Sequence, residues 1–415
     1  MPREINQCRI CRNPKLVTLL DLGSQSLTGI FPKSTDEPIT RGPLELVKCD
    51  GEKSCGLVQL RHSYDPAEMY GANYGYRSSL NRSMVEHLRG KVALLCARIP
   101  LTKEDIVLDI GSNDGTLLSF YPPEIASVGM DPTSAKFREL YQPHILALPE
   151  FFSSASFRKH FGGRKAKIVT SIAMFYDLED PISFVGQVAE TLADDGIWHF
   201  EQSYLPAMLA ANAYDTICHE HVEYYALRQI QWVMERCGLR ILSAERNDVN
   251  GGSFAVTVAK SHSHHHADEA AVAAMLDAEK RSGLDGLEPY HGFRERVMRH
   301  REGLRALLGG IAREGRSVLG YGASTKGNVI LQFCGLTPEQ IPAIAEVNAD
   351  KFGKFTPGTN IPIISEAQAH AMKPDCLLVL PWHFRANLIQ READFLRGGG
   401  RMIFPLPEIE VFSSK

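Results

Sequence analysis

Residues 105–260 alternate short apolar runs with helix-like segments, and this alternation restricts the fold more than any other feature of the sequence. Strand-like runs separated by helical patterns are typical of a parallel sheet with helices packed on its faces. The last two runs flank Asn250-Gly251-Gly252, which predicts an antiparallel hairpin. The predicted strands are Ile106–Ile110, Ala126–Met130, Ile168–Ile172, Gly196–Phe200, Arg240–Ala244 and Ser253–Ala259.

Three domains are expected along the 415 residues, which are too many for one compact core. Short apolar runs near the N-terminus, separated by turn-like sequences such as Arg41-Gly42-Pro43, predict a small β-rich module. Residues 261–315 are Ala-rich, charged and helical, and a second α/β unit begins at Ser317. The expected fold class is α/β. The predicted boundaries are 1–75 for the N-terminal module, 76–262 for the middle domain, and 263–415 for the helical connector with a C-terminal Rossmann-like domain.

The composition excludes several classes of protein. Apolar residues make up 44% and charged residues 23%, as in folded soluble proteins. The 45 Lys and Arg against 49 Asp and Glu leave a net charge of −4, which argues against non-specific binding to nucleic acid. No apolar run approaches the ~20 residues of a membrane span, and the first residues lack the apolar segment of a secretory signal. With nine Cys, an odd number, we expect a cytoplasmic protein with free thiols and one metal site.

Four of these cysteines form two pairs near the N-terminus. Cys8 and Cys11 are a C-x2-C pair, and Cys49 and Cys55 follow as a C-x5-C pair. Two such pairs can bring four thiolates around one Zn²⁺ in a tetrahedron. Four protein ligands leave no open position for catalysis, so we expect the zinc to be structural. The alternative is four unrelated free thiols.

A glycine-rich loop follows the first strand of the middle domain. Asp109 lies at the end of that strand, and Gly111 and Gly115 form a G-x3-G turn that we expect to lead into a helix. Glycines at such a turn let the backbone approach a ligand closely. Asp131 ends the next strand, where it would hold the hydroxyls of a ribose. The predicted cofactor-binding residues are Asp109, Gly111, Ser112, Asn113, Gly115 and Asp131.

This loop has an ordinary alternative, a strand–helix turn with a capping Asp and no ligand. The spacing of its glycines also differs from the G-x-G-x-x-G pattern of dinucleotide-binding proteins. Taken together with the terminal hairpin, residues 80–260 resemble a class I S-adenosylmethionine (SAM) methyltransferase.

The densest cluster of titratable side chains in the chain is His219-Glu220-His221. It follows the strand that ends at residue 200, and so we expect it at the carboxyl edge of the sheet, where α/β proteins bind ligands. A neutral His can remove a proton from a carbon that an adjacent ketone has made acidic. A metal site formed by the two His and an acid, or a polar surface loop, are the alternatives. The run from His262 to His266 is expected to be a solvated turn.

A second glycine motif opens the C-terminal unit, where a strand leads into a helix. Its glycines, hydroxyls and Lys326 suit phosphate oxygens at a helix N-terminus. Glu346 ends the next strand at a position suited to a ribose, and Trp382 lies in a loop at the same edge. The alternative is a nucleotide fold that has lost its ligand. The predicted substrate-binding residues are Tyr321, Ser324, Thr325, Lys326, Asn328, Glu346 and Trp382.

The order of these four motifs resembles that of the three-domain sugar C-methyltransferases of deoxysugar biosynthesis, over essentially the whole chain. That family places a methyl branch on C-3 of a nucleotide-linked 4-keto sugar. The resemblance implies a zinc-binding N-terminal domain, a central class I SAM-binding domain and a C-terminal Rossmann-like domain that helps to hold the nucleotide sugar.

The resemblance also implies roles for individual residues. His221 is the expected general base and Glu220 its accompanying acid, with His219 in the same catalytic group. Cys218 stands where some members have Tyr, so an auxiliary phenol is missing from this chain. The active-site Tyr that precedes the SAM fold best matches Tyr76, with Tyr70 and Tyr74 as alternatives.

The expected reaction is SAM-dependent methylation of the carbon beside the ketone, through an enolate formed with the help of His221. The substrate would be a TDP- or GDP-linked keto sugar, and the protein a monomer or weak homo-oligomer without nucleic-acid or membrane partners. One alternative is a small-molecule O- or N-methyltransferase. Others are a zinc-containing nucleic-acid-binding protein with a degenerate methyltransferase fold, and an inactive scaffold.

Overall fold

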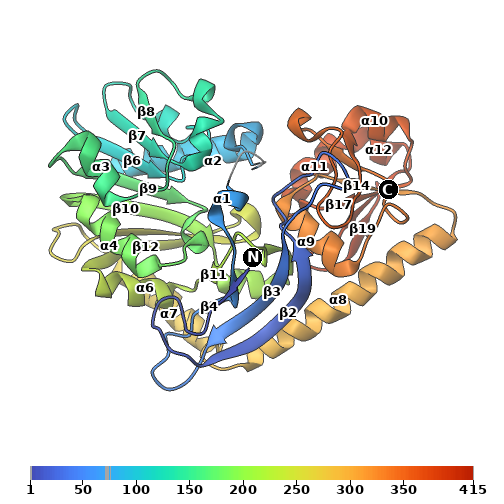
Figure 1. The fold of residues 1–415 in the computed structure, drawn as a ribbon, viewed down its shortest axis with the longest axis horizontal. Coiled ribbons are helices and arrows are strands. Elements are labelled where there is room, and N and C mark those ends of the chain that lie inside the picture. Colours follow the sequence, from blue (N-terminus) through green and yellow to red (C-terminus); the bar gives the residue numbers. More distant parts are fainter. Residues whose placement is uncertain (1, 71–73, 75, 415) are drawn as a thin grey trace.

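The computed structural model describes residues 2–70, 74 and 76–414. Three main sheets of four, seven and six strands form the N-terminal module, the middle domain and the C-terminal domain. The two larger domains lie at opposite sides of the molecule, and the N-terminal module lies between and below them (Figure 1). The α/β fold with Rossmann-like sheets that the sequence predicts is therefore confirmed. The domain boundaries at residues 75 and 262 stay predictions.

The N-terminal module is a four-stranded sheet with the order β11-β4-β3-β2, and its outermost strand β11 comes from the middle of the chain. A separate two-stranded sheet pairs β1 with β5. The strands are β1 (Arg3–Glu4), β2 (Leu16–Ser26), β3 (Arg41–Cys49), β4 (Val58–Leu60), β5 (His62–Ser63) and β11 (Glu223–Tyr224).

The prediction of a turn at Arg41-Gly42-Pro43 is wrong, because these residues begin strand β3. They pair with Ser24–Ser26 of β2. Strand β4 pairs only with the later residues 46–48 of β3, so Pro43 has a strand partner on one side only. Proline is tolerated where a strand has no second neighbour that needs its missing N–H.

The middle domain has a seven-stranded sheet with the order β12-β13-β10-β9-β6-β7-β8. It is parallel except for β13, which runs antiparallel to both β10 and β12. The strand order reverses direction between β6 and β9, and a crevice for ligands forms at the carboxyl ends of strands at such a point. The strands are β6 (Ile106–Ile110), β7 (Ala126–Met130), β8 (Ile145–Leu148), β9 (Ala166–Ile172), β10 (Leu192–Ser203), β12 (Leu239–Asn247) and β13 (Ser253–Lys260).

Helices cover both faces of this sheet. Helix α2 packs its buried side chains on one face, and α4 and α6 pack on the other. The helices of this domain are α2 (Arg82–Arg98), α3 (Ser154–Phe161), α4 (Pro181–Thr191), α5 (Leu205–Ala210) and α6 (Leu227–Arg236). The short helix α1 (Pro66–Met69) precedes them and packs Met69 against the N-terminal module.

The helix predicted directly after Gly115 is replaced by a single 3-10 turn, η2 (Leu118–Phe120). Pro122 and Pro123 follow within three residues. Proline lacks the N–H that would continue a helix, and it disfavours helical dihedral angles in the residue before it. The glycine loop therefore has no long helix whose dipole could act on a ligand.

The C-terminal domain has a six-stranded sheet with the order β16-β15-β14-β17-β18-β19, parallel except for β19. Its strands are β14 (Val318–Tyr321), β15 (Ile344–Glu346), β16 (Ile363–Ser365), β17 (Cys376–Val379), β18 (Arg401–Phe404) and β19 (Glu410–Phe412). The helices after the middle domain are α7 (Glu269–Arg281), α8 (Glu288–Arg313), α9 (Thr325–Cys334), α10 (Glu366–Ala371), α11 (Arg385–Arg391) and α12 (Ala393–Arg397).

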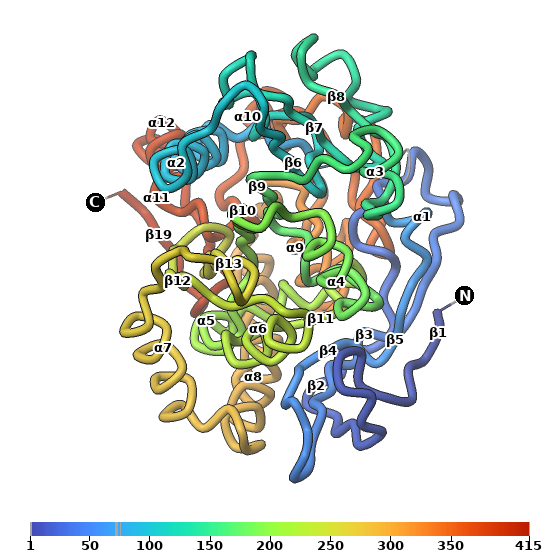
Figure 2. Tube along the Cα trace, turned by 90° about the vertical axis from the view of Figure 1, so that its left-hand side faces the viewer, coloured from blue at the N-terminus to red at the C-terminus, as the bar shows by residue number. Residues whose placement is uncertain are grey.

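Helices α7 and α8 form the helical connector that the sequence predicts, and α8 runs beside β2 toward the C-terminal domain (Figure 1). Both helices lie below β12 and β13 in Figure 2. Within the described residues, every helix is too short or too polar to cross a membrane.

The N-terminal module contacts both larger domains through hydrogen bonds. On the middle domain, Gln229 donates from Nε2 to the carbonyl of Cys55 at 3.0 Å. On the C-terminal domain, the amide N–H of Ser26 donates to Gln332 Oε1 at 2.7 Å, and Asn328 Nδ2 donates to the carbonyl of Thr28 at 2.7 Å. The module therefore holds the other two domains together.

Glu279 of α7 caps the N-terminus of α6. Its buried carboxylate accepts from the amide N–H groups of Leu227 (2.6 Å) and Arg228 (3.1 Å) and from the hydroxyl of Tyr204 (2.8 Å). A carboxylate at this position satisfies helix N–H groups that have no partner inside the helix.

Replacing Glu279 by Ala should lower the free energy of unfolding by about 2 kcal/mol, because three buried donors lose their acceptor. Urea unfolding would measure this as a lower midpoint at an unchanged slope. The matched control is Glu288→Ala, since the Glu288 side chain is 94% exposed. Equal midpoints for the two variants would contradict the capping role.

Candidate active site and zinc site

The four predicted metal ligands come together in the N-terminal module. The ligand atoms of Cys8, Cys11, Cys49 and Cys55 all lie within 4.8 Å of one another. Sγ of Cys8 lies 3.5 Å from Sγ of Cys55, and Sγ of Cys11 lies 3.4 Å from Sγ of Cys49. A tetrahedron with Zn–S bonds of about 2.3 Å has edges of roughly 3.8 Å, so the sulfur positions fit a zinc ion.

Neighbouring donors also suit thiolate ligands. The amide N–H of Leu57 points at Cys55 Sγ (3.5 Å), and Asn13 donates from Nδ2 to Cys49 Sγ (3.4 Å). Such contacts orient metal ligands. Among the residues that the structure describes, one group of possible metal ligands (His, Cys, Asp or Glu) lies close enough together to hold a metal, and it consists of these four cysteines. The alternative in which His219 and His221 share a metal with an acid therefore finds no support in that part of the chain.

The glycine loop lies at the carboxyl edge of the large sheet, between β6 and β7. Asp131 braces it from the end of β7, because Oδ2 accepts from the amide N–H of Asn113 at 2.8 Å and Oδ1 accepts from that of Thr133 at 2.6 Å. Asp109 is buried beneath the loop and accepts from the hydroxyl of Thr170 at 2.6 Å. Burial raises the pKa of Asp109 to about 7. Gly111 has a φ of +77°, a conformation that favours glycine.

Two side chains of this loop hold the segment that contains Tyr76. Asn113 donates from Nδ2 to the Tyr76 carbonyl (3.2 Å) and accepts at Oδ1 from the amide N–H of Ser78 (3.0 Å). Asp114 accepts from the amide N–H of Ser79 at 2.9 Å. The Tyr76 side chain is 46% exposed. The predicted cofactor residue Asn113 thus uses its side chain to place Tyr76 beside the loop.

Ser112, another predicted cofactor residue, shares a hydrogen bond of 2.8 Å with the hydroxyl of Tyr141. The Tyr141 hydroxyl also donates to the Asn113 carbonyl at 2.9 Å. A Cβ atom at Gly115 would lie 2.9 Å from the Tyr141 ring, so the ring packs closely only because residue 115 is Gly. The loop is therefore preformed by contacts within the chain.

His221 is held in one orientation and, in its neutral form, in one tautomer. Its Nδ1 lies 2.9 Å from the carbonyl of Thr216, and a carbonyl accepts only from a protonated nitrogen. The neutral ring therefore carries its proton on Nδ1 and leaves the lone pair of Nε2 free. The side chain is half-buried. Burial, and then the positive charge of Lys326, lower the pKa of His221 to about 3.

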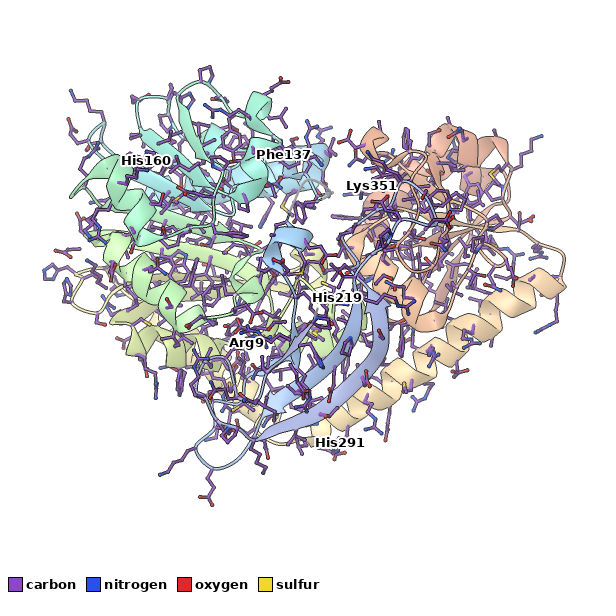
Figure 3. All side chains as sticks on the ribbon, in the orientation of Figure 1. Arg9, Phe137, His160, His219, His291 and Lys351 are labelled. Atoms are coloured by element: carbon purple, nitrogen blue, oxygen red, sulfur yellow. The ribbon has the colours of Figure 1, made fainter. Side chains whose placement is uncertain are left out.

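The side chains of His219 and Glu220 contact residues of the N-terminal module. His219 packs edge-on against Tyr64, with ring centroids 4.6 Å apart, and its Nε2 lies 3.5 Å from the Gly42 carbonyl. Figure 3 shows His219 beside the strands of the N-terminal module. Glu220 accepts from the hydroxyl of Thr28 at 3.2 Å. Burial raises the pKa of Glu220. His219 and Glu220 therefore bond to the module, whereas His221 bonds to Thr216 of its own segment.

The predicted substrate residues also divide into two sets. Lys326 donates from Nζ to the carbonyl of Asn250 at 2.9 Å, which joins α9 to the middle domain. Trp382 donates from Nε1 to Asp215 Oδ2 at 2.8 Å, beside the His-Glu-His segment. Thr325 lies next to Lys326 in the first turn of α9. These residues lie where the middle and C-terminal domains meet.

The side chains of the other four bond within the C-terminal domain or to the N-terminal module. The Ser324 hydroxyl caps α9 by accepting from the amide N–H of Gly327 (3.0 Å), and Asn328 bonds to the N-terminal module. The Tyr321 hydroxyl lies 2.6 Å from Glu366 Oε1 and 2.7 Å from Glu392 Oε1, and it donates its one proton to one of these two carboxylates. Glu346 accepts from the amide N–H of Ala323 at 2.9 Å. These side chains hold the shape of the loop after β14. A ligand at this loop would contact the backbone of the loop.

A cavity of about 290 Å³ lies between the middle and C-terminal domains. It is lined by one turn of α2, by the loop before β13 and by the segment that begins α11. The lining residues are Ser83, Met84, His87, Asp248, Val249, Asn250, His383, Phe384, Ala386 and Asn387. Because the carbonyl of Asn250 accepts from Lys326, the cavity is adjacent to the ammonium group that the sequence predicts to bind phosphate.

Two further residues beside His221 were not predicted from the sequence: Tyr176 and Asp177, in the 3-10 helix η5 (Phe175–Asp177) after β9. The Tyr176 ring lies 4.2 Å from the His221 ring. Asp177 Oδ1 is buried without a hydrogen-bond partner among the described residues. The sequence did contain an indication of their place, because they follow the predicted strand Ile168–Ile172. That strand ends at the sheet edge where the other site residues were expected.

The fold and the site together define a SAM-dependent methyltransferase with a zinc-binding module. Three family models match the chain: "Putative zinc binding domain" over residues 8–70, "Methyltransferase domain" over 84–244 and "C-methyltransferase C-terminal domain" over 248–407. The C-methyltransferase NovU of Streptomyces niveus is 34% identical over 420 residues, which cover 100% of this chain and 98% of that protein.

The chain therefore belongs to the three-domain sugar C-methyltransferase family that the order of its motifs predicts. It is a SAM-dependent C-methyltransferase, and the predictions of enzyme class and cofactors are confirmed.

Solved structures of methyltransferases resemble part of the chain. The mitomycin 7-O-methyltransferase MmcR is 15% identical, covering 43% of this chain and 54% of that chain, with a TM-score of 0.34. A SAM-dependent methyltransferase from Clostridium acetobutylicum is 13% identical, covering 42% and 92%, with a TM-score of 0.33.

Replacing Cys49 by Ser should remove bound zinc and loosen the pairing of β4 with β11. That pairing includes the bond from the amide N–H of Leu60 to the Val222 carbonyl (2.9 Å), one residue after His221. Hydrogen exchange followed by mass spectrometry should show protection over residues 58–60 falling by about tenfold or more. Cys237→Ser, outside the cluster, is the control. Full protection in a zinc-free Cys49 variant would contradict this coupling.

Proposed function

We propose that this enzyme methylates the carbon beside the ketone, C-3, of a TDP- or GDP-linked 4-keto deoxysugar. The observation that supports this most strongly is the state of His221, a neutral imidazole whose Nδ1 proton is bound and whose Nε2 lone pair is free. Methylation of carbon requires a positioned base, whereas many O-methylations depend mainly on proximity. Family membership and the NovU relative support the same reaction class.

In the proposed mechanism, Nε2 of His221 removes the proton from the carbon beside the ketone. The Thr216 carbonyl, which accepts from Nδ1–H, stabilises the positive charge that the ring then acquires. The electron pair left on the substrate forms an enolate, whose carbon takes the methyl group. Bound SAM supplies that methyl group as an electrophile on its sulfonium. Asp131 and the glycine loop bind and orient it through the preformed contacts of the loop.

The nucleotide part of the substrate would occupy the boundary between the middle and C-terminal domains. Lys326 lies in the first turn of α9, where its ammonium group and the helix dipole both favour phosphate oxygens. The adjacent cavity of about 290 Å³ offers space for part of the nucleoside. We further propose that the enzyme works in the cytoplasm as a monomer or weak homo-oligomer, without nucleic-acid or membrane partners.

Mass spectrometry would test this function with SAM and a panel of TDP- and GDP-linked 4-keto-6-deoxysugars in deuterated water. One added methyl group, with deuterium exchange beside the ketone, is the expected result. His221→Asn should abolish both while leaving SAM affinity nearly unchanged. A methyl group found on oxygen or nitrogen, or no methylation of any panel member by protein that binds SAM, would contradict the proposal.

The pH dependence of kcat/KM provides a prediction specific to His221. A base must be unprotonated, and the pKa of about 3 keeps His221 neutral throughout the range from pH 8 to pH 5. We therefore expect no loss of kcat/KM near pH 6.5, the ordinary pKa of His, and an acid limb only below pH 5. Circular dichroism at each pH would show that the protein is folded. A half-maximal rate near pH 6.5 would be inconsistent with this state of His221.

Lys326→Met should raise KM for the sugar nucleotide by about tenfold to 100-fold, since a charge-assisted contact with the diphosphate is lost. The KM for SAM should stay within twofold. Lys280→Met, on the exposed face of α7, is the matched control and should leave both constants unchanged. An unchanged KM for the sugar nucleotide in the Lys326 variant would exclude the phosphate role.

A further inference from the structure

Position 218, in the segment that contains His221, offers no hydroxyl to the oxygen of the substrate ketone. Cys218 occupies the position where some family members have Tyr, and its thiol is fully buried. A thiol is a weak hydrogen-bond donor. An enolate oxygen formed beside His221 would need a stronger donor, because the negative charge develops on that oxygen in the transition state.

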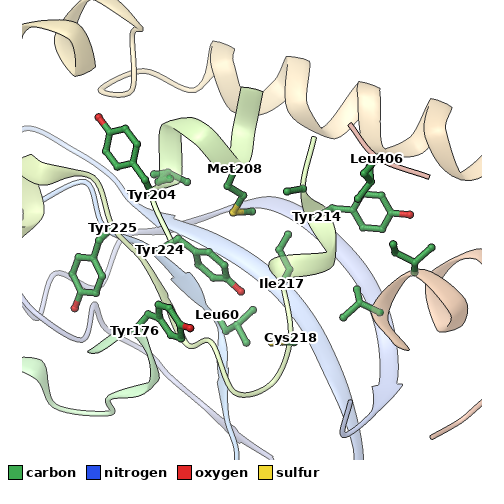
Figure 4. Packing of buried hydrophobic residues seen from close by; sticks show 14 of the residues in the cluster. Leu60, Tyr176, Tyr204, Met208, Tyr214, Ile217, Cys218, Tyr224, Tyr225 and Leu406 are labelled. Atoms are coloured by element: carbon green, nitrogen blue, oxygen red, sulfur yellow. The ribbon is translucent and has the colours of Figure 1, made fainter. Parts of the chain in front are cut away.

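Tyr176 offers such a donor from a different element. Its ring lies 4.2 Å from the His221 ring, at an interplanar angle of 56°. It comes from η5 at the end of β9, and Figure 4 shows it in the same cluster as Cys218 and Tyr224. The side chain is only 7% exposed, so water is largely kept from the ring.

Two tyrosines of the His221 segment, Tyr224 and Tyr225, already have partners. The Tyr225 hydroxyl donates to Glu223 Oε2 at 2.6 Å, and the Tyr224 hydroxyl donates to the Thr216 carbonyl at 3.4 Å. Within the described part of the chain, the Tyr176 hydroxyl makes no such bond, and it is not among the fully enclosed polar atoms. It is therefore free to meet a ligand.

We propose that Tyr176 is a catalytic residue that donates its hydroxyl hydrogen bond to the ketone oxygen of the substrate, replacing the phenol that is missing at position 218. This inference rests on the proposed function. The phenol keeps its proton throughout. His221 takes the proton from carbon, and the electron pair moves onto the oxygen held by Tyr176. The electron pair returns to carbon as the new C–C bond forms and the C–S bond of the methyl donor breaks.

The surroundings of Tyr176 favour a protonated phenol. Burial raises its pKa well above the usual value, and Asp177, Tyr74 and Cys218 act in the same direction. The hydroxyl is therefore a hydrogen-bond donor at every pH at which the enzyme would work.

The test is Tyr176→Phe, which removes the hydroxyl and preserves the ring that packs on His221. We expect kcat to fall by about 100-fold, and deuterium exchange beside the ketone in the absence of SAM to slow by a similar factor. SAM affinity by calorimetry should be unchanged. Tyr290→Phe is the matched control, because its hydroxyl bonds to the Leu284 carbonyl.

The double variant Tyr176→Phe with Cys218→Tyr should recover at least tenfold of the lost exchange rate.

If the Tyr176→Phe variant exchanges deuterium and turns over at the rates of the wild-type enzyme, the role of Tyr176 is overturned. If the wild-type enzyme itself methylates no keto sugar, the proposed function is overturned. If the Phe variant loses SAM binding, 3,5-difluorotyrosine at position 176 keeps the side-chain shape and changes the acidity of its hydroxyl. A changed exchange rate would then support the proposal, and an unchanged rate would contradict it.

Discussion

The pairing of β11 with β4 is the contact on which the arrangement of the site depends. Strand β11 begins two residues after His221, and it forms the outer strand of the N-terminal sheet. The neighbouring Leu60 amide extends this pairing to Val222. Four cysteines that fit a zinc ion stabilise the same small module, which has little core of its own. The expected structural metal and the expected base are therefore mechanically linked, although the zinc ligands lie outside the catalytic edge.

All three domains position residues of the proposed site. The large sheet places the glycine loop and η5 at its carboxyl edge, the module holds the His221 segment above that edge, and the C-terminal domain adds Lys326. Glu220 illustrates how closely they fit, because a side chain at Gly29 would collide with its carboxylate. His219 and Glu220 thus fix the loop to the module, and this leaves His221 free to act on a substrate.

Local signals allowed the sheets and the zinc ligands to be predicted from the sequence. The sheets follow from the alternation of strand-like and helical segments, and the zinc ligands follow from the spacing of Cys8, Cys11, Cys49 and Cys55. Both patterns are visible in the sequence, so they predict these features without knowledge of the fold. The tautomer of His221 depends on the Thr216 carbonyl, and the packing of Tyr176 depends on a segment about 45 residues away in the chain. Contacts between segments that are distant in the chain cannot be predicted from a local sequence pattern. Likewise Asn113 and Tyr321 have suitable chemistry for ligands, but other parts of the chain already bind their side chains.

The state of His221 is the central claim of this account, and NMR of ¹⁵N-labelled imidazole tests it most directly. The signal of His221 would be assigned with His221→Asn. At pH 7 we predict a protonated Nδ1 and a bare Nε2, with shifts that stay constant from pH 8 to pH 5. A ring that titrates near pH 6.5, or that carries its proton on Nε2, would contradict the assignment of His221 as the base.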